Sequence, residues 1–143
     1  AASLERPVKL MIALEMIGYY DSAPGSQNYP YPAMSWLYPD RGDFIAVVGR
    51  MQDINAVRQV KAALLSSRDL SVYSMNAPGF IPGIDFSDHL NYWQHDIPAV
   101  MITDTAFYRN KQYHLPGDTA DRLNYQKMAQ VVDGVITLLY NSK

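Results

Sequence analysis

An α/β fold is predicted for this chain, with three layers in which helices cover both faces of a mostly parallel, mixed sheet. Two observations predict this class. Short apolar runs typical of buried strands alternate along the chain with longer segments in which apolar residues recur at helical spacing. At 143 residues and 48% hydrophobic composition, the chain is also long enough for one domain with a substantial core, so a single domain over residues 1–143 is expected.

The expected strands are short apolar runs bounded by polar or turn residues. They cover Val8–Leu14, Phe44–Gly49, Leu70–Met75 and the run between Pro98 and Asp104. The first run is nearly unbroken, as in a strand covered on both faces. Asp104 falls at the carboxyl end of the last strand, and ligands bind at that edge of open α/β sheets.

The expected helices begin at residues that can cap them. The caps are Asp53 for a helix to about Ser67, Ser87 for a helix starting at Asp88, and Asn124 for the last helix, where Leu123 and Met128 form a hydrophobic staple. The apolar positions assigned to the core share one helix face. They are Ile54, Val57, Val60, Leu64 and Leu65 in the first helix, and Met128, Val131, Val132, Val135, Ile136 and Leu139 in the last.

A long irregular loop is expected from Asp21 to Asp43, because the segment is rich in proline and small polar residues. Loops of this length are uncommon in compact domains and often line binding sites. The loop carries four large aromatic residues, Tyr29, Tyr31, Trp36 and Tyr38. They either contact a substrate or partner, or cover a small core of the loop itself.

A histidine, a rigid Pro-Gly turn and a carboxylate come together in Tyr113–Thr119. Zinc binds a neutral imidazole in a fixed orientation, which a short stiff loop and a nearby carboxylate can provide. An isolated histidine in a polar turn is more often a hydrogen-bonded surface residue. His114 therefore becomes a candidate ligand only if partners occur elsewhere.

Glu15 directly follows the first apolar run. Burying an ionised carboxylate without a partner costs several kcal/mol. We therefore expect Glu15 to be paired with a cation, to bind a metal, or to lie where the strand emerges. Asp88 and His89 offer further polar groups, although helix capping by Ser87 and an acidic first turn also account for this segment.

Three segments in this order resemble the zinc-dependent exopeptidases with co-catalytic metal sites, which include bacterial aminopeptidases and relatives of glutamate carboxypeptidase and glutaminyl cyclase. The matching pieces are Leu14–Tyr19, Ser87–His89 with Ile97–Ala99, and Tyr113–Asp121. The resemblance runs from about Val8 to the C-terminus and implies part of a phosphorylase/hydrolase-like aminopeptidase fold.

The resemblance also implies roles for individual residues. Glu15 would bind one zinc ion and His114 the other, whereas Asp88 and His89 would belong to the wall of the same cleft. Asp118 would orient a ligand or fix the loop. Tyr92 and Tyr113 are candidates for the oxyanion-stabilising tyrosine of some relatives, because Ile84 stands at the position expected for it.

The family supplies a His, a bridging Asp and a Glu-Glu pair before these ligands, and the chain contains no Glu-Glu pair. The sequence therefore resembles the C-terminal half of such an enzyme, without the general base, so no catalytic residue is assigned. One ligand for each metal is fewer than a stable zinc site needs. We expect two zinc ions and a peptide substrate in the complete enzyme, and little or no peptidase activity from this chain alone.

Composition excludes several other classes. A net charge of −2 with scattered basic residues does not favour nucleic acid or an anionic membrane, and the apolar runs are too short to span a bilayer. The absence of cysteine excludes disulfides and thiolate chemistry. The family resemblance implies export in a bacterium, to the periplasm or the extracellular space.

Two alternatives to a peptidase fragment stay open. One is a non-catalytic interaction module that keeps the fold, as in transferrin receptor relatives, although retention of both Glu15 and His114 argues against it. The other is glutaminyl cyclisation with a single zinc. In the C-terminal half of such an enzyme, a sheet edge that is central in the complete enzyme would be exposed and would favour a homodimer or aggregation.

Overall fold

The protein contains a four-stranded mixed sheet in the order β1-β4-β2-β3. The structure is a computed structural model that describes residues 7–78 and 81–141 of the single domain expected over the whole chain. Its strands are β1 (Met11–Leu14), β2 (Ile45–Gly49), β3 (Val72–Asn76) and β4 (Ala99–Thr103). β1 is parallel to β4 and β2 is parallel to β3, whereas β2 and β4 are antiparallel.

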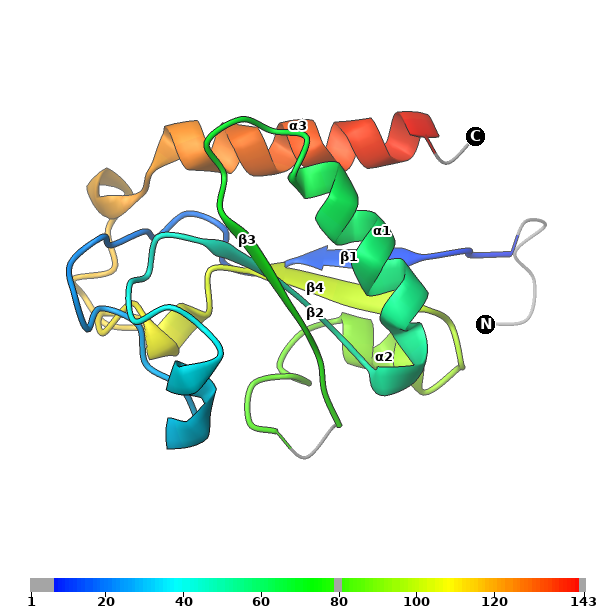
Figure 1. Ribbon diagram of the computed structural model, residues 1–143, viewed down its shortest axis with the longest axis horizontal. Coiled ribbons are helices and arrows are strands. Elements are labelled where there is room, and N and C mark those ends of the chain that lie inside the picture. Colours follow the sequence, from blue (N-terminus) through cyan, green and yellow to red (C-terminus); the bar gives the residue numbers. More distant parts are fainter. Residues whose placement is uncertain (1–6, 79–80, 142–143) are drawn as a thin grey trace.

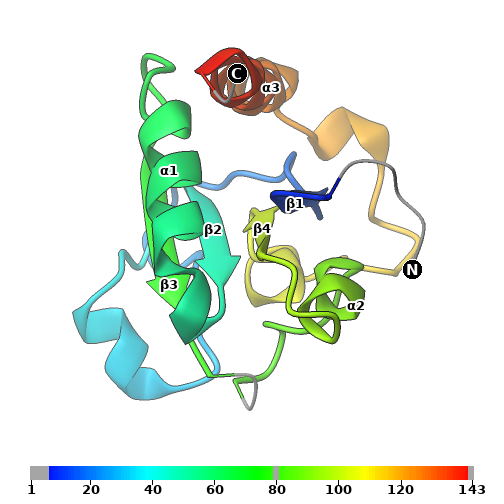
Figure 2. The ribbon, with the colours of Figure 1, turned by 90° about the vertical axis from the view of Figure 1, so that its right-hand side faces the viewer.

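Helices cover both faces of this sheet. α1 (Ile54–Leu64) and α3 (Tyr125–Asn141) lie on one face, and the short α2 (His89–Trp93) lies on the other (Figures 1 and 2). The α/β class with three layers is therefore confirmed. None of the helices within the described ranges is long and apolar enough to cross a membrane.

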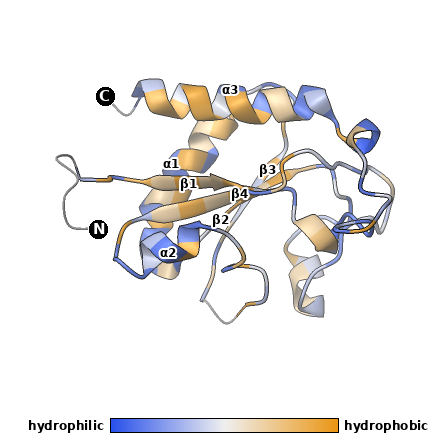
Figure 3. Ribbon diagram, turned by 180° about the vertical axis from the view of Figure 1, so that it is seen from behind, coloured by the Kyte–Doolittle hydropathy of each residue, from blue (hydrophilic) through white to orange (hydrophobic). Residues whose placement is uncertain are grey.

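Two hydrophobic cores separate the layers, because alternate residues of each strand point to opposite faces. Ile45, Val47 and Ile102 pack with α1 and α3, whereas Ala46 and Met101 pack on the face covered by α2. Figure 3 shows the resulting concentration of apolar residues in the strands and along the helices. All residues of β2 and β4 are buried, as expected for central strands.

β1 differs from the prediction for Val8–Leu14. The strand is shorter, begins at Met11 and lies at an edge of the sheet, and Leu14 is 47% exposed. Both faces of β1 are nevertheless covered in part, since Ile12 packs against the core on the α1 and α3 side and Met11 and Ala13 against the core on the α2 side. An apolar run does not reveal how many neighbouring strands it has, so the edge position was not predictable.

The helix starts were predicted with mixed success. Asn124 caps α3, since its Oδ1 accepts a hydrogen bond of 3.0 Å from the Lys127 amide. Asp53 occupies the N-cap position of α1 but makes no capping hydrogen bond, because its carboxylate accepts from the Arg50 guanidinium. Ser87 does not cap α2, and its hydroxyl donates instead to Glu15.

The predicted core faces of the long helices were also partly wrong. Val57, Val60 and Leu64 of α1 are buried, whereas Ile54 and Leu65 are exposed. In α3 the buried residues are Val131, Gly134 and Leu138. Three positions assigned to the core, Val132, Ile136 and Leu139, are 43%, 43% and 63% exposed.

The segment from Asp21 to Asp43 is irregular, as predicted. Its regular structure is limited to one 3₁₀ helix, Pro32–Trp36, and an isolated bridge between Asp21 and Gly42. The bridge brings the ends of the loop together, and the Tyr38 hydroxyl ties the loop to the sheet by donating to the Ser74 carbonyl of β3.

Candidate active-site pocket

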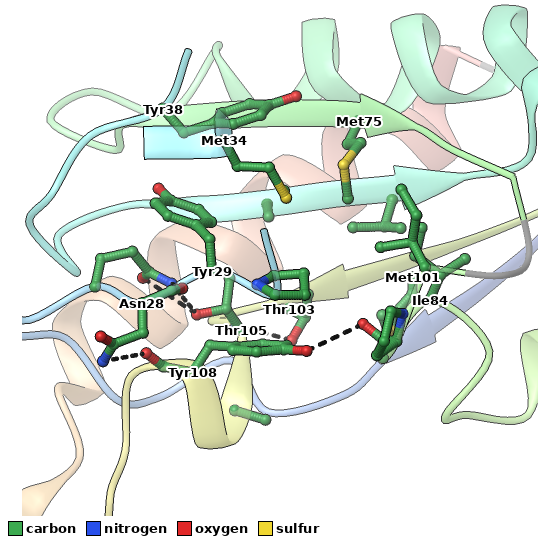
Figure 4. Close-up of a pocket in the computed structure, with 18 of the residues that line it drawn as sticks. Asn28, Tyr29, Met34, Tyr38, Met75, Ile84, Met101, Thr103, Thr105 and Tyr108 are labelled. Carbon is green, nitrogen blue, oxygen red and sulfur yellow. Dashed lines mark hydrogen bonds between the residues drawn. The ribbon is translucent and has the colours of Figure 1, made fainter. Parts of the chain in front are cut away.

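An apolar cavity of about 110 Å³ lies against the α2 face of the sheet, beneath the loop from Asp21 to Asp43 (Figure 4). Its floor consists of alternate strand residues that share this face. These are Ala46 and Val48 of β2, Tyr73 and Met75 of β3, and Met101 and Thr103 of β4.

The irregular loop forms one wall of the cavity. Tyr29, Met34 and Tyr38 line it, and both tyrosines are fixed by hydrogen bonds. The Tyr29 hydroxyl donates to the Pro39 carbonyl at 2.7 Å, and the Tyr38 hydroxyl donates to the Ser74 carbonyl at 3.2 Å. Burial raises the pKa of both phenols, so they stay neutral hydrogen-bonding groups.

The four aromatic residues of this loop therefore have different positions. Tyr29 and Tyr38 face the cavity, as the substrate-contact alternative expected. Tyr31 is 44% exposed and Trp36 is 86% exposed. The alternative in which all four cover a core within the loop was wrong.

The opposite wall comes from two segments that are distant in sequence. Ile84 and Phe86 lie on the first, and Phe107, Tyr108 and Tyr113 on the second. The Tyr108 hydroxyl donates to the Pro82 carbonyl at 3.3 Å and joins the two segments. Tyr113 stacks on His114, with ring centroids 3.9 Å apart.

Glu15 lies immediately after β1, is half-buried and borders the cavity. Its carboxylate accepts a hydrogen bond of 3.2 Å from the Ser87 hydroxyl. Among the described residues, no lysine, arginine or histidine forms an ion pair with it. Within the described ranges Glu15 therefore has no cation partner, and it stands where the strand emerges.

His114 is exposed in a turn whose backbone is left-handed at this residue, with φ of 59°. The turn is held by hydrogen bonds around Asn110. The Asn110 amide donates to Asp118 at 2.8 Å, and Arg122 donates to the Asn110 side-chain oxygen at 3.0 Å. The hydrogen bond between Asn110 and Asp118 thus closes the loop that carries His114.

His89 is completely buried. Its Nε2 lies 2.6 Å from the Ile84 carbonyl oxygen, so this nitrogen carries the hydrogen and donates. Burial lowers the pKa of the imidazole and keeps it neutral, and the ring packs against the edge of Trp93. Asp88 and His89 do not line the cavity, and their role in a cleft stays a prediction.

Asp104 fixes the segment that follows Glu15, a role the sequence did not reveal. Its carboxylate accepts hydrogen bonds from the amides of Gly18, Tyr19 and Ala106, at 3.1, 2.7 and 2.9 Å. Burial raises the pKa of Asp104 to about 6. The three amide hydrogen bonds lower this pKa, but burial has the larger effect. The only sequence signal was a carboxylate at the end of a buried strand.

Left-handed backbone occurs at the same edge of the sheet. Met16 directly follows Glu15 with φ of 56°, and Thr105 directly follows Asp104 with φ of 76°. Such conformations cost about 1–3 kcal/mol in residues other than glycine and concentrate at functional sites. They mark the ends of β1 and β4 beside the cavity as the candidate site.

The described residues do not fit a complete zinc site. They contain no group of three or more His, Cys, Asp or Glu side chains that could hold a metal ion. Glu15 borders the cavity, and His114 follows Tyr113 on the cavity wall. Protein zinc sites need three or four protein ligands, so these two candidate ligands do not suffice.

The model of peptidase family M28 matches residues 2–139. The chain belongs to this family. The family resemblance found in the sequence is thus confirmed. This M28 chain is also 97% identical over all its residues to YfbL of Escherichia coli (strain K12), and it spans 44% of the length of that protein.

Solved structures from Legionella pneumophila share the fold. LapA, described as an aminopeptidase, is 21% identical with a TM-score of 0.63, and the match covers 92% of this chain and 30% of LapA. LapB is 18% identical with a TM-score of 0.65, and the match covers 94% of this chain and 31% of LapB. The M28 chain therefore has a peptidase fold and spans less than half of these proteins.

Proposed function

We propose that this M28 chain supplies the pocket for the N-terminal side chain of a peptide, within an aminopeptidase that is completed by residues outside the chain. The observation that carries the proposal is the apolar cavity bordered by Glu15 and Tyr113. Glu15 and His114 are the ligands that we propose this chain contributes to a zinc centre. The remaining ligands and the general base would come from the rest of the longer protein.

The cavity favours large apolar side chains. Its floor and walls carry methionine, tyrosine and small apolar residues, and the carboxylate of Glu15 is the charged group among its lining residues. An apolar pocket gains about 0.8 kcal/mol for each buried methylene group and penalises an unpaired charge. We therefore propose substrates whose first residue is Leu, Met or Phe rather than Lys or Asp.

The test uses the longer E. coli relative and a series of aminoacyl anilides. We expect kcat/KM for leucyl, methionyl and phenylalanyl substrates to exceed that for aspartyl and lysyl substrates by at least tenfold. Met75→Glu places a carboxylate in the cavity floor, and it should lower kcat/KM for the apolar substrates by roughly tenfold or more.

Met51→Glu is the matched control, because Met51 is exposed and does not line the cavity. It should leave kcat/KM within about twofold. Equal losses in both variants, or equal rates on apolar and charged substrates, would show that this cavity does not select the side chain.

A second candidate is a non-catalytic interaction module. The absence of a metal-binding group among the described residues favours it. Zinc-dependent hydrolysis by the longer relative would exclude this candidate for the complete protein. Absence of both zinc binding and hydrolysis in that protein would favour it. Export in a bacterium, implied by the family resemblance, stays a proposal that cell fractionation of the relative would test.

A further inference from the structure

Arg122 connects the two parts of the structure that carry Glu15 and His114, although it does not line the cavity. It is the last residue of a short 3₁₀ helix, Ala120–Arg122. We refer to residues 110–118, which precede this helix and carry His114, as the His114 turn. Figure 1 shows the 3₁₀ helix in orange, close to the blue segment that follows β1.

The guanidinium of Arg122 holds the His114 turn on both sides of the histidine. Its Nη1 donates to the Asn110 side-chain oxygen at 3.0 Å and to the Gly117 carbonyl at 3.1 Å. Asn110 is 1% exposed, so this end of the turn is fixed in the interior. Between these two contacts His114 has left-handed backbone with φ of 59°, which a residue other than glycine keeps only when its surroundings hold it.

The same guanidinium contacts the segment that follows Glu15. Its Nη2 donates to the Tyr19 hydroxyl at 3.0 Å, and its central carbon lies 4.8 Å from the centroid of the Tyr19 ring. The backbone of Tyr19 is itself held on both sides. Its N–H donates to Asp104 at 2.7 Å, and its C=O accepts from Arg109 at 3.1 Å. Arg122 therefore bonds to a tyrosine whose position is set by other contacts.

The main chain beside Arg122 is also anchored to this segment. The Asn124 amide donates to the Gly18 carbonyl at 2.8 Å. The base of the arginine side chain is therefore fixed close to Tyr19, and its guanidinium reaches from there to the His114 turn. The length of this side chain consequently sets how far the turn lies from the segment that follows Glu15.

Neutralisation of charge does not explain this arginine. Its hydrogen-bond partners are a side-chain amide oxygen, a backbone carbonyl and a phenol hydroxyl. No carboxylate among the described residues forms an ion pair with it. A guanidinium presents several N–H donors in a rigid planar fork, whereas the ammonium group of lysine is a point charge on a flexible stem. Contacts with three acceptors in fixed directions therefore require arginine at position 122.

We propose that Arg122 is a positioning residue, which fixes the His114 turn relative to the segment that follows Glu15. This role rests on the proposed function, because it concerns the two candidate ligands of this chain. Without the guanidinium, the turn loses its attachment to Tyr19, and His114 samples several positions relative to Glu15. Misplacement of a functional group by about 1 Å can lower a reaction rate by roughly a hundredfold.

Amide order parameters from nitrogen-15 relaxation in this chain test the positioning role directly. In Arg122→Lys, the order parameters at His114 and Leu115 should fall from about 0.85 to below about 0.6, whereas those of β4 should stay unchanged. Tyr19→Phe removes the hydroxyl and keeps the ring, and it should lower the same order parameters.

Arg58→Lys and Tyr31→Phe are matched controls, because both residues are exposed and neither lines the cavity. They should leave all these order parameters unchanged. An unchanged His114 turn in Arg122→Lys, or a fall that includes β4, would overturn the proposal. An effect of Arg122→Lys without any effect of Tyr19→Phe would also overturn it, because Arg122 would then not connect the turn to the Glu15 segment.

Kinetics of the longer relative give a second readout. The corresponding Arg122→Lys substitution should lower kcat for a leucyl anilide by at least tenfold. KM and the preference for leucyl over lysyl substrates should stay within about twofold, because neither Arg122 nor Tyr19 lines the cavity. A raised KM with unchanged kcat would overturn the role in the site. Absence of hydrolysis by the unmodified relative would contradict the proposed function alone, and the order parameters would still decide whether Arg122 positions the turn.

Discussion

The charge state of Asp104 is linked to the stability of this structure, because its carboxyl group is buried. Its folded pKa is raised to about 6 from an ordinary value of 3.8, chiefly by burial. The folded protein therefore binds more protons than the unfolded chain between about pH 4 and pH 6. The free energy of unfolding contributed by Asp104 falls as pH rises through this window and is constant above it.

Asp104→Asn is expected to remove this pH dependence. It also turns an amide N–H₂ toward backbone N–H donors, which should cost about 1–3 kcal/mol. The stability lost on substitution should be larger at pH 4 than at pH 7. The difference should reach up to about 3 kcal/mol, because the pKa of Asp104 rises from 3.8 to about 6 on folding. Urea denaturation at several pH values measures this difference.

Asp133→Asn is the matched control, because Asp133 is exposed on α3. It should change stability by less than about 0.5 kcal/mol at each pH. A stability loss for Asp104→Asn that grows with pH would show the opposite, namely that the three amide hydrogen bonds lower the pKa of Asp104 and outweigh burial.

The sequence revealed single residues of the site better than their partners. Glu15 was recognisable because a carboxylate at the end of an apolar run needs an explanation. Its hydrogen bond from Ser87 spans 72 positions in sequence and had no local signal, since Ser87 also resembled a helix cap. The cavity residues Met75 and Met101 were predicted only as parts of strands. Alternation predicts which face a strand residue shares and not whether that face is filled.

At the scale of elements, contact between α1 and α3 depends on a glycine. A Cβ atom at Gly134 would lie 2.7 Å from Leu64 Cδ2 and 2.8 Å from Leu64 Cα, and the second is a backbone atom that cannot move aside alone. This approach lets the two helices pack closely over the sheet.

Gly134→Ala should therefore destabilise the protein by about 1–3 kcal/mol, because the helices must separate. Helix propensity alone predicts the opposite, a gain of about 1 kcal/mol. The free energy of unfolding from urea denaturation decides between them. Ala129→Gly, at an exposed position of α3, is the control and should cost about 1 kcal/mol from propensity. A stabilised Gly134→Ala variant would show that the contact is not tight.

The order and type of the helices and strands were predictable from the sequence, whereas the side of each helix that is buried was not. The four strands and three helices that were predicted appear in the expected order, because apolar periodicity is a local signal. Caps were less informative, since Asn124 caps its helix whereas Asp53 and Ser87 do not. The stripe of α3 misled the prediction, since a helix that is apolar over more than one side has an ambiguous buried face. Gly134 identifies the buried face of α3, because only a residue without a side chain allows α1 to approach at that position.

At the scale of the whole molecule, an uncovered apolar edge has a consequence for the chain alone. In the isolated chain, the β1 edge is free to pair with a second copy of the chain. A homodimer through this edge is therefore expected at high protein concentration. Sedimentation velocity over a range of concentrations measures it, and Val132→Asp should weaken the dimer if α3 takes part. A chain that stays monomeric throughout would contradict the expectation.

Zinc binding by this chain can be tested through its two candidate ligands, Glu15 and His114. Glu15 borders the cavity and His114 follows the cavity residue Tyr113, and no group of three candidate ligands occurs in the described part of the chain. We therefore expect native mass spectrometry with added zinc to show no stoichiometric retention and expect no hydrolysis of an aminoacyl anilide. Retention that is lost in Glu15→Ala and His114→Ala, but kept in the exposed-histidine control His95→Ala, would show that a specific site forms within or between these chains. Because two ligands rarely hold zinc against buffer exchange, such a result would require further ligands from a second copy or from residues outside the described ranges. Retention by all variants alike would indicate adventitious binding and would agree with the expectation.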